Sequence, residues 1–423
     1  MKFVSTRNAS PSVTLSQALS DGLAPDGGLY VPEALPRFAV EDFVGLERVD
    51  EIGARLLAPF FEGDALADSL AQICKEALNF ALPLKRLDEQ TSILELFHGP
   101  TAAFKDVGAR FLASCLSRLA AGDARPLTIL VATSGDTGGA VASAFHQKPN
   151  IEVQVLYPLG KVSPRQEHQL TCWGDNVRAF AVRGVFDDCQ RLVKDAFADP
   201  WWRENKRLSS ANSINIGRVL PQMIYYACAS LWHFRQSGQN AGFVIPTGNL
   251  GNALACMWAH EMGLPIREIM LATNANRPIV DFLGGSGWQP RPSVSTLASA
   301  MDVGDPSNME RVRHLFADDD ALRTAIRALS VDDAMIEETI RDGLERYREV
   351  FCPHTAVAMC VREQLPATPW IVVATAHPAK FEQIVEPLIG RPVEIPPALA
   401  SLFERPAHHV EIAAQLNALT GEQ

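Results

Sequence analysis

From about residue 91 onward, short apolar runs alternate with loops and with stretches of helical periodicity. Two of the runs lead directly into Gly-rich loops, and a helical segment follows each of those loops. Strand, loop and helix in this alternation are typical of parallel α/β layers. The apolar runs are LTILVA (127–132), IEVQVLYP (151–158), GFVIP (242–246), REIMLATNA (267–275) and the start of WIVVATAHPAKF (370–381).

The chain before this alternation has a different character. The segment PDGGLYVPEALP (25–36) is rich in turn residues, and helical periodicity follows over 53–78. We therefore predict three parts, which are an N-terminal module (1–90), a first α/β domain (91–210) and a second α/β domain (211–423). Within the last part, we expect 291–308 to be a long ordered loop or a linker, and 309–329 to be a polar helix.

The composition is that of an ordinary soluble globular protein, with 423 residues, 47% hydrophobic and 21% charged, and a net charge of -11. No block of lysine and arginine stands out, which argues against a nucleic-acid partner. No signal peptide and no membrane span is expected. The eight scattered cysteines form no CxxC pair and no zinc spacing, so we expect reduced thiols, no metal and a cytoplasmic location.

Lys105 lies in HGPTAAFKDVGARF (98–111), behind two alanines and between a phenylalanine and an aspartate. A lysine that attacks a carbonyl must be uncharged, and an apolar setting favours the uncharged amine. Taken alone, the segment also fits an ordinary exposed lysine near a helix start.

Two loops at predicted strand ends precede helices. The loop 133–139 (TSGDTGG) combines glycines and hydroxyls, and the helix after it would attract an anion such as a carboxylate. The loop 246–252 (PTGNLGN) is a plausible phosphate cradle. It lacks both the Gly-Lys-Ser/Thr ending of a Walker loop and the GxGxxG pattern. A helix cap with turn glycines would also explain the first loop.

A third loop, 374–381 (ATAHPAKF), places Thr375 where an apolar run ends. The hydroxyl of Thr375 could donate a hydrogen bond to a buried heteroatom. Alternatively, Thr375 could be an ordinary helix N-cap, and His377 could have no role in a site. Together the three loops and the lysine match pyridoxal phosphate, which has an aldehyde for the lysine, a phosphate for a helix N-terminus and a ring nitrogen that needs a partner.

The chain resembles the threonine synthase family. Members of this family are pyridoxal-phosphate enzymes of fold type II, the group that includes the tryptophan synthase β-subunit. The resemblance runs almost from end to end. It implies two parallel-sheet α/β domains around a cofactor cleft, with a helical N-terminal module. The matching segments are 5–33, LFHGPTAAFKDVGARF (96–111), ATSGDTGGAVASAF (132–145), YPLGKVSPRQEHQLT (157–171), ANSINIGRVLPQMIYY (211–226), IPTGNLGN (245–252), SAMDVGDPSNMERV (299–312), CPHTAVA (352–358) and ATAHPAKF (374–381).

The resemblance also implies roles for individual residues. Lys105 matches the lysine that forms the Schiff base with the cofactor, and Thr375 matches the hydroxyl that faces the pyridine nitrogen. The cofactor-phosphate loop corresponds to Gly248, Asn249, Leu250, Gly251 and Asn252. The loop that holds the amino-acid end of the substrate corresponds to Ser134, Asp136 and Thr137. Segments that line the substrate and its phosphate contain Lys161, Ser163, Asn212, Ser213 and Arg218. Lys161 and Arg218 could equally be surface ion pairs.

Two positions depart from the family pattern. Leu250 stands where the family often has phenylalanine, and the region around Arg277 is less acidic than usual, which leaves the contacts of that arginine open. His354 is expected to be structural, because no partner ligand lies at metal spacing.

The reaction that the resemblance implies converts O-phospho-L-homoserine and water to L-threonine and phosphate. A small-molecule substrate is then the only expected partner of a monomer or homodimer. Three alternatives remain, which are a related phospholyase that eliminates phosphate without making threonine, a non-catalytic homologue, and a nucleotide-dependent enzyme. The intact Lys105 segment and glycine loops argue against the second, and the missing Walker and GxGxxG patterns argue against the third.

Overall fold

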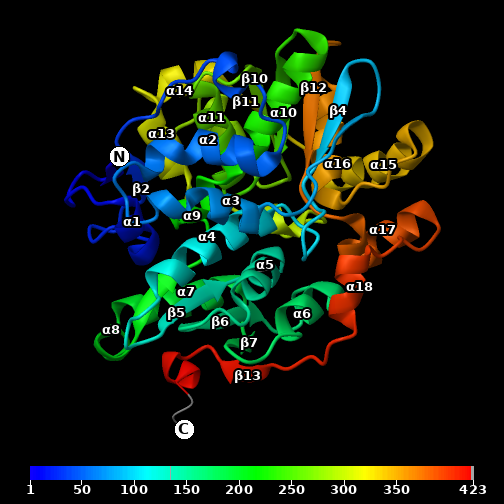
Figure 1. Cartoon of the computed structure of the whole chain (residues 1–423). Coiled ribbons are helices and arrows are strands. Elements are labelled where there is room, and N and C mark those ends of the chain that lie inside the picture. The colour runs from blue at the N-terminus through cyan, green and yellow to red at the C-terminus, as the bar shows by residue number, and fades with distance from the viewer. Residues whose placement is uncertain (134, 421–423) are drawn as a thin grey trace.

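The structure is a computed structural model, and it describes residues 1–133 and 135–420. Two separate sheets, each largely parallel, form the centre of the molecule (Figure 1). The α/β class and the fold expected from the sequence are confirmed. Within the described residues, no helix is long and apolar enough to cross a membrane.

The larger sheet has six strands in the order β11-β10-β9-β12-β4-β3. All neighbours are parallel except β3 and β4, which pair antiparallel. Helices α10, α11 and α16 pack against its strands. The strands are β3 (Leu84–Arg86), β4 (Thr91–Glu95), β9 (Ala241–Pro246), β10 (Ile266–Thr273), β11 (Ile326–Ser330) and β12 (Trp370–Ala374). The helices are α10 (Gln222–Ser237), α11 (Gly251–Glu261), α12 (Pro278–Leu283), α13 (Met309–Leu315), α14 (Asp319–Ala325), α15 (Asp333–Asp342) and α16 (Pro353–Glu363).

The smaller sheet is parallel throughout, in the order β13-β7-β6-β5-β8. Helices α5, α6 and α7 pack on its strands. The strands are β5 (Leu127–Ala132), β6 (Ile151–Pro158), β7 (Val177–Arg183), β8 (Arg207–Ser210) and β13 (Val410–Ala413). The helices are α4 (Lys105–Leu119), α5 (Asp136–Phe145), α6 (Pro164–Thr171), α7 (Phe186–Ala198), α8 (Pro200–Asn205) and α9 (Ile216–Val219).

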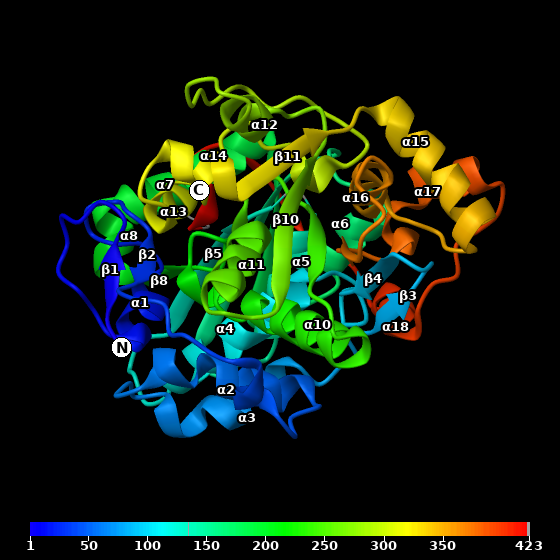
Figure 2. The same ribbon diagram turned by 90° about the horizontal axis from the view of Figure 1, so that it is seen from above.

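The N-terminal module combines an antiparallel ribbon with helices. Strands β1 (Phe3–Ser5) and β2 (Tyr30–Pro32) form the ribbon, and the helices are α1 (Leu15–Asp21), α2 (Val49–Phe61) and α3 (Leu70–Ala77). Helix α2 packs on α10, and α3 packs on α4. Figure 2 shows these helices along one side of the molecule, beside α4 and α10.

The apolar strand runs form the buried centre of both sheets, as their composition predicts. Every residue of β5, β9 and β12 is buried. Strands covered by helices on both faces need apolar side chains in both directions, which explains continuous rather than alternating hydrophobicity. All five predicted apolar runs are strands in the structure.

Three segments differ from the sequence-based expectation. Strand β4, placed in the first α/β domain by its position in the chain, pairs with β12 of the larger sheet. Strand β13, close to the C-terminus, pairs with β7 of the smaller sheet. The chain reaches it through α17 (Glu382–Ile389) and α18 (Pro397–Phe403), which descend along one side of the molecule in Figure 1. The rest of the three-part division stays a prediction.

The third difference concerns 309–329, predicted as one polar helix. It forms two short helices, α13 and α14, and its last residues enter β11. Asp318 ends the helical run locally, because its side chain accepts a hydrogen bond from the amide of Ala321 at 2.8 Å and so starts a new helix.

Candidate active site

Three loops meet at the carboxyl edge of the larger sheet. Strands β9 and β12 are parallel neighbours, so the loops that begin at Thr247 and Thr375 leave the same edge. The segment before Lys105 contacts the loop that begins at Thr375, because the amide of Phe104 donates a hydrogen bond to the carbonyl of Thr375 at 2.8 Å. An antiparallel bridge between Ala103 and Ala376 extends this contact. Ligands of open parallel sheets bind at this edge.

Asp106 explains the unusual framing of Lys105. Its buried carboxylate accepts hydrogen bonds from the amide of Thr101 at 2.9 Å and from the Thr101 hydroxyl at 2.7 Å. Gly99 packs so closely that an added Cβ would lie 2.5 Å from an Asp106 oxygen. Burial raises the pKa of Asp106, and the Thr101 bonds oppose that shift. The aspartate thus fixes the turn that presents Lys105 at the start of α4.

The surroundings of Lys105 favour its neutral amine. Burial is the main reason that its pKa falls to about 8, and the nearby cations Lys380 and Arg218 add to the shift, while Asp136 opposes it. An ordinary lysine has a pKa of about 10.4, so the uncharged fraction of Lys105 at neutral pH is roughly two hundred times larger than that of an ordinary lysine. The structure therefore gives Lys105 the property that a nucleophilic lysine needs.

The glycine loop after β9 is held by its own side chains. The Thr247 hydroxyl donates to the Asn252 side chain at 2.7 Å, and that side chain donates to the carbonyl of Pro246 at 2.9 Å. Leu250 has a φ of 62° immediately before α11. Gly248 has no room for a side chain, because an added Cβ would lie 2.8 Å from the Cα of Met301. The loop forms a narrow cradle at a helix N-terminus, where amides are free for an anion.

A buried arginine, Arg311, is connected to this loop through the side chain of Asn308. The sequence alone does not indicate this arginine. Arg311 donates to the carbonyls of Tyr30 and Ser213, both at 2.9 Å, to the Asn308 side chain at 2.7 Å, and to the carbonyl of Ile214 at 2.6 Å. Asn308 in turn donates to the carbonyl of Asn249 at 3.1 Å. Burial lowers the pKa of Arg311 to about 9.

The loop after β5 carries a buried ion pair. Asp136, at the start of α5, lies 2.8 Å from the ammonium of Lys380 and accepts a hydrogen bond from Gln166 at 3.0 Å. Burial opposes ionisation of Asp136, but the positive charges of Lys380 and Lys105 outweigh it and hold its pKa below the usual range. Thr137 is the second residue of α5. Ser134 lies outside the described residues.

The five predicted substrate-segment residues differ in position. Arg218 is buried, its Nε has no hydrogen-bond partner among the described residues, and it therefore forms no surface ion pair. Lys161 is exposed. Ser163 caps α6, and its hydroxyl donates to the carbonyl of Lys380 at 3.2 Å. The Asn212 side chain donates to the carbonyl of Ala132 at 3.0 Å, and the Ser213 hydroxyl accepts from Asn249 at 2.6 Å.

Two further residues complete the description of the predicted positions. His354 is buried and accepts a hydrogen bond from the amide of Ala300 at 3.1 Å, and burial lowers its pKa to about 4. Arg277 is half exposed and contacts Ser330 at 2.5 Å and Asp281 at 3.3 Å. Its side chain thus bonds to surface partners.

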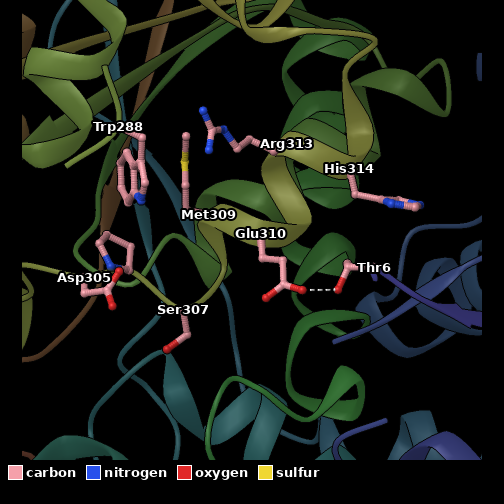
Figure 3. Close-up of a pocket in the computed structure, with 9 residues that line it drawn as sticks. Thr6, Trp288, Asp305, Ser307, Met309, Glu310, Arg313 and His314 are labelled. Atoms are coloured by element: carbon pink, nitrogen blue, oxygen red, sulfur yellow. Dashed lines mark hydrogen bonds between the residues drawn. The ribbon is translucent and has the colours of Figure 1, made fainter. Parts of the chain in front are cut away.

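A separate pocket of about 570 Å³ lies beside the glycine loop after β9, and Figure 3 shows the side chains that line it. Its wall includes Ser307, whose amide donates to the Asn249 side chain at 2.6 Å. Trp288, Glu310 and Arg313 also line it, and Glu310 is held by the Thr6 hydroxyl at 2.6 Å. This pocket contains none of the predicted cofactor or substrate residues.

The donor set fits pyridoxal phosphate. A lysine with a lowered pKa can bond the aldehyde, the glycine cradle can hold the phosphate, and Thr375 lies at the end of the strand next to the cradle. Fold and site together define a pyridoxal-phosphate-dependent enzyme of fold type II. In agreement, a family profile described as "Pyridoxal-phosphate dependent enzyme" matches residues 82–375.

Two further profiles narrow the family. "Threonine synthase N terminus" matches residues 2–78, and "Threonine synthase, C-terminal" matches residues 355–421. Threonine synthase of Escherichia coli (strain K12) is 37% identical over 99% of this chain and 98% of its own. The chain belongs to the threonine synthase family, whose members are pyridoxal-phosphate-dependent lyases.

Solved structures agree with this assignment. The crystal structure of threonine synthase from Escherichia coli has a TM-score of 0.92 and 38% identity, covering 100% of this chain and 99% of the other. Threonine synthase from Brucella melitensis, solved with pyridoxal phosphate bound, has a TM-score of 0.92 and 34% identity, covering 100% of this chain and 98% of the other.

Proposed function

We propose that this chain converts O-phospho-L-homoserine and water to L-threonine and phosphate. The observation that carries the proposal is Lys105, a lysine with a pKa of about 8 at the junction of three strand-end loops. Family membership gives the reaction class, and the position of Lys105 gives the residue that would move protons in it.

The cofactor would be held by the glycine loop and by two residues outside it, Lys105 and Thr375. We assign its phosphate to the segment Gly248–Asn252, with the amides at the start of α11 as donors. We assign its ring nitrogen to the Thr375 hydroxyl, which is neutral and so cannot keep that nitrogen protonated as a carboxylate could. Bound pyridoxal phosphate supplies an aldehyde for an amine and an electron sink for the adjacent carbon.

Lys105 would then act on the substrate as a base and an acid. Displaced by the substrate amine, its side chain reaches the same carbon and can take the α-proton. A β-proton and the γ-phosphate must also leave. A proton then returns to the γ-carbon, the hydroxyl of water adds at the β-carbon, and a proton returns to the α-carbon. A pKa near the working pH suits a group that both accepts and returns protons.

The other predicted residues would position the substrate. Its amino-acid end would lie at the start of α5, beside Ser134, Asp136 and Thr137. Ser163, Asn212 and Ser213 would line the remaining space. For the departing phosphate, buried Arg218 with a free Nε is a better donor than exposed Lys161, because a dry cation stabilises developing charge more strongly.

We further propose a cytoplasmic monomer or homodimer. Support for that compartment is the state of the eight cysteines, which are all buried and unpaired in the described part of the chain.

The test is product analysis of the purified protein with pyridoxal phosphate and O-phospho-L-homoserine, beside a Lys105→Ala variant. Equal amounts of threonine and phosphate, lost in the variant, are expected. Phosphate with 2-oxobutyrate and no threonine would identify a phospholyase instead. Neither product, despite bound cofactor, would leave the family assignment in place and overturn the substrate.

A further inference from the structure

Lys380 is a second lysine at the site and is fully buried, and the roles proposed above do not use it. It lies in the short 3₁₀ turn Pro378–Phe381 that follows β12, and its side chain is 1% exposed. Its ammonium donates to the carbonyl of Thr101 at 2.8 Å and lies 2.8 Å from the carboxylate of Asp136. A buried lysine needs such partners, because an unpaired buried charge is strongly unfavourable.

These contacts join three segments that are distant in sequence. Thr101 belongs to the turn that presents Lys105, Asp136 begins α5 of the smaller sheet, and Lys380 follows a strand of the larger sheet. Neighbouring bonds hold the same junction, since Arg165 of α6 donates to the carbonyl of Ala379 at 2.6 Å. Lys380 therefore fixes the loop after β5 relative to the reactive lysine.

The charge on Asp136 raises a question about substrate binding. The start of α5 is the proposed place for the amino-acid end of the substrate, which carries a carboxylate. A bare aspartate there would repel that carboxylate, and the repulsion would be strong in a buried setting. Asp136 is 4% exposed, so water screens it little, whereas Lys380 at 2.8 Å cancels its charge.

We propose that Lys380 is a positioning residue that neutralises Asp136 and fixes the loop at the start of α5, so that this loop accepts the substrate carboxylate. This inference rests on the proposed function. The charged and titratable groups that face Lys105 in the same junction are Asp136 from α5, Arg218 from α9, His354 from α16 and Lys380 itself. Lys380 is the member of this set that bonds to both the Lys105 turn and Asp136.

The experiment compares two ligands that differ only in the carboxylate. Dissociation constants of L-threonine and L-threoninamide are measured on the holoenzyme, from the change in the visible absorbance of the bound cofactor. Lys380→Met leaves Asp136 without its cationic partner. The dissociation constant should therefore rise by about tenfold or more for L-threonine and by less than about threefold for L-threoninamide. Adding Asp136→Asn to Lys380→Met removes the repelling charge and should restore most of the L-threonine affinity.

Equal weakening of both ligands, or no recovery in the double variant, would overturn the inference and leave Lys380 a purely structural role. If Lys380→Met does not fold, the ligand preference of the Asp136→Asn single variant tests the inference. It should keep or increase the preference for L-threonine over L-threoninamide, and loss of that preference would show that Asp136 itself binds the substrate. The ligand comparison needs no turnover, so a wild type that makes no threonine would overturn the proposed function separately.

Discussion

The two halves of the candidate site are built in opposite ways. Around Lys105 lie three buried charged side chains from different segments, Asp136, Arg218 and Lys380, and their charges shift the pKa of Lys105. Around the glycine loop, hydroxyls and amides make the bonds, and the buried charge of Arg311 is bonded to neutral oxygens. The first half suits the proton transfer that we propose for Lys105, and the second suits the phosphate binding that we propose for the glycine loop.

The largest expected effect comes from the charged half. Arg218→Leu should lower kcat/KM by about a hundredfold or more, because the departing phosphate would lose a dry cationic donor. Lys161→Ala is the matched control and should change kcat/KM by less than about threefold, since Lys161 is exposed. The kcat/KM of both variants is measured from steady-state phosphate release. A larger loss in Lys161→Ala than in Arg218→Leu would assign the departing phosphate to Lys161.

Arg311 tests whether the neutral half depends on its one cation. Arg311→Met removes four hydrogen bonds, two of them fully buried, and should lower the free energy of unfolding by about 3 kcal/mol or more. Arg313→Met, on the same helix, breaks a part-exposed pair with Asp319 and a contact over the Phe282 ring at 5.1 Å, and it should lower the free energy of unfolding by only about 1 kcal/mol. Denaturant titration of both variants measures the difference, and similar losses would contradict this account.

Gly248 tests the shape of the cradle directly. Gly248→Ala places a Cβ 2.8 Å from the Cα of Met301, so the loop must move, and the dissociation constant for pyridoxal phosphate should rise by about tenfold. Gly287→Ala is the control, because its Cβ would meet nothing within 4 Å. Unchanged cofactor affinity in Gly248→Ala would mean that the cradle tolerates a side chain.

The smallest predicted change concerns the turn before Lys105. Thr101→Val removes the hydroxyl bond to Asp106 at 2.7 Å but keeps the backbone bond at 2.9 Å. Thermal unfolding should show that the free energy of unfolding falls by about 1–2 kcal/mol. A loss below about 0.3 kcal/mol would mean that the backbone bond alone fixes this turn.

The sequence predicts the neutral half of the site better than the charged half. Glycines at a strand end and a helix start reveal the cradle locally, and continuous apolar runs reveal the central strands. The sequence does not indicate the contacts of Lys380, because its partners Thr101 and Asp136 are distant in sequence and only the packing of the two sheets brings them together. The sequence predicts a helix where β11 forms, because helical periodicity runs up to this strand without a Gly or Pro break.

The central claim is that the surroundings of Lys105 lower its pKa to about 8, so that a far larger fraction of its amine is neutral near physiological pH than in an ordinary lysine. The most direct measurement is the rate of acetylation of Lys105 against pH in the cofactor-free protein, read by mass spectrometry, with the denatured chain as control. Only the deprotonated amine reacts, so labelling rises with pH and is half-maximal at the pKa. We predict a midpoint of about 8 in the folded protein. A midpoint near 10.5, as in an ordinary lysine, would contradict the account.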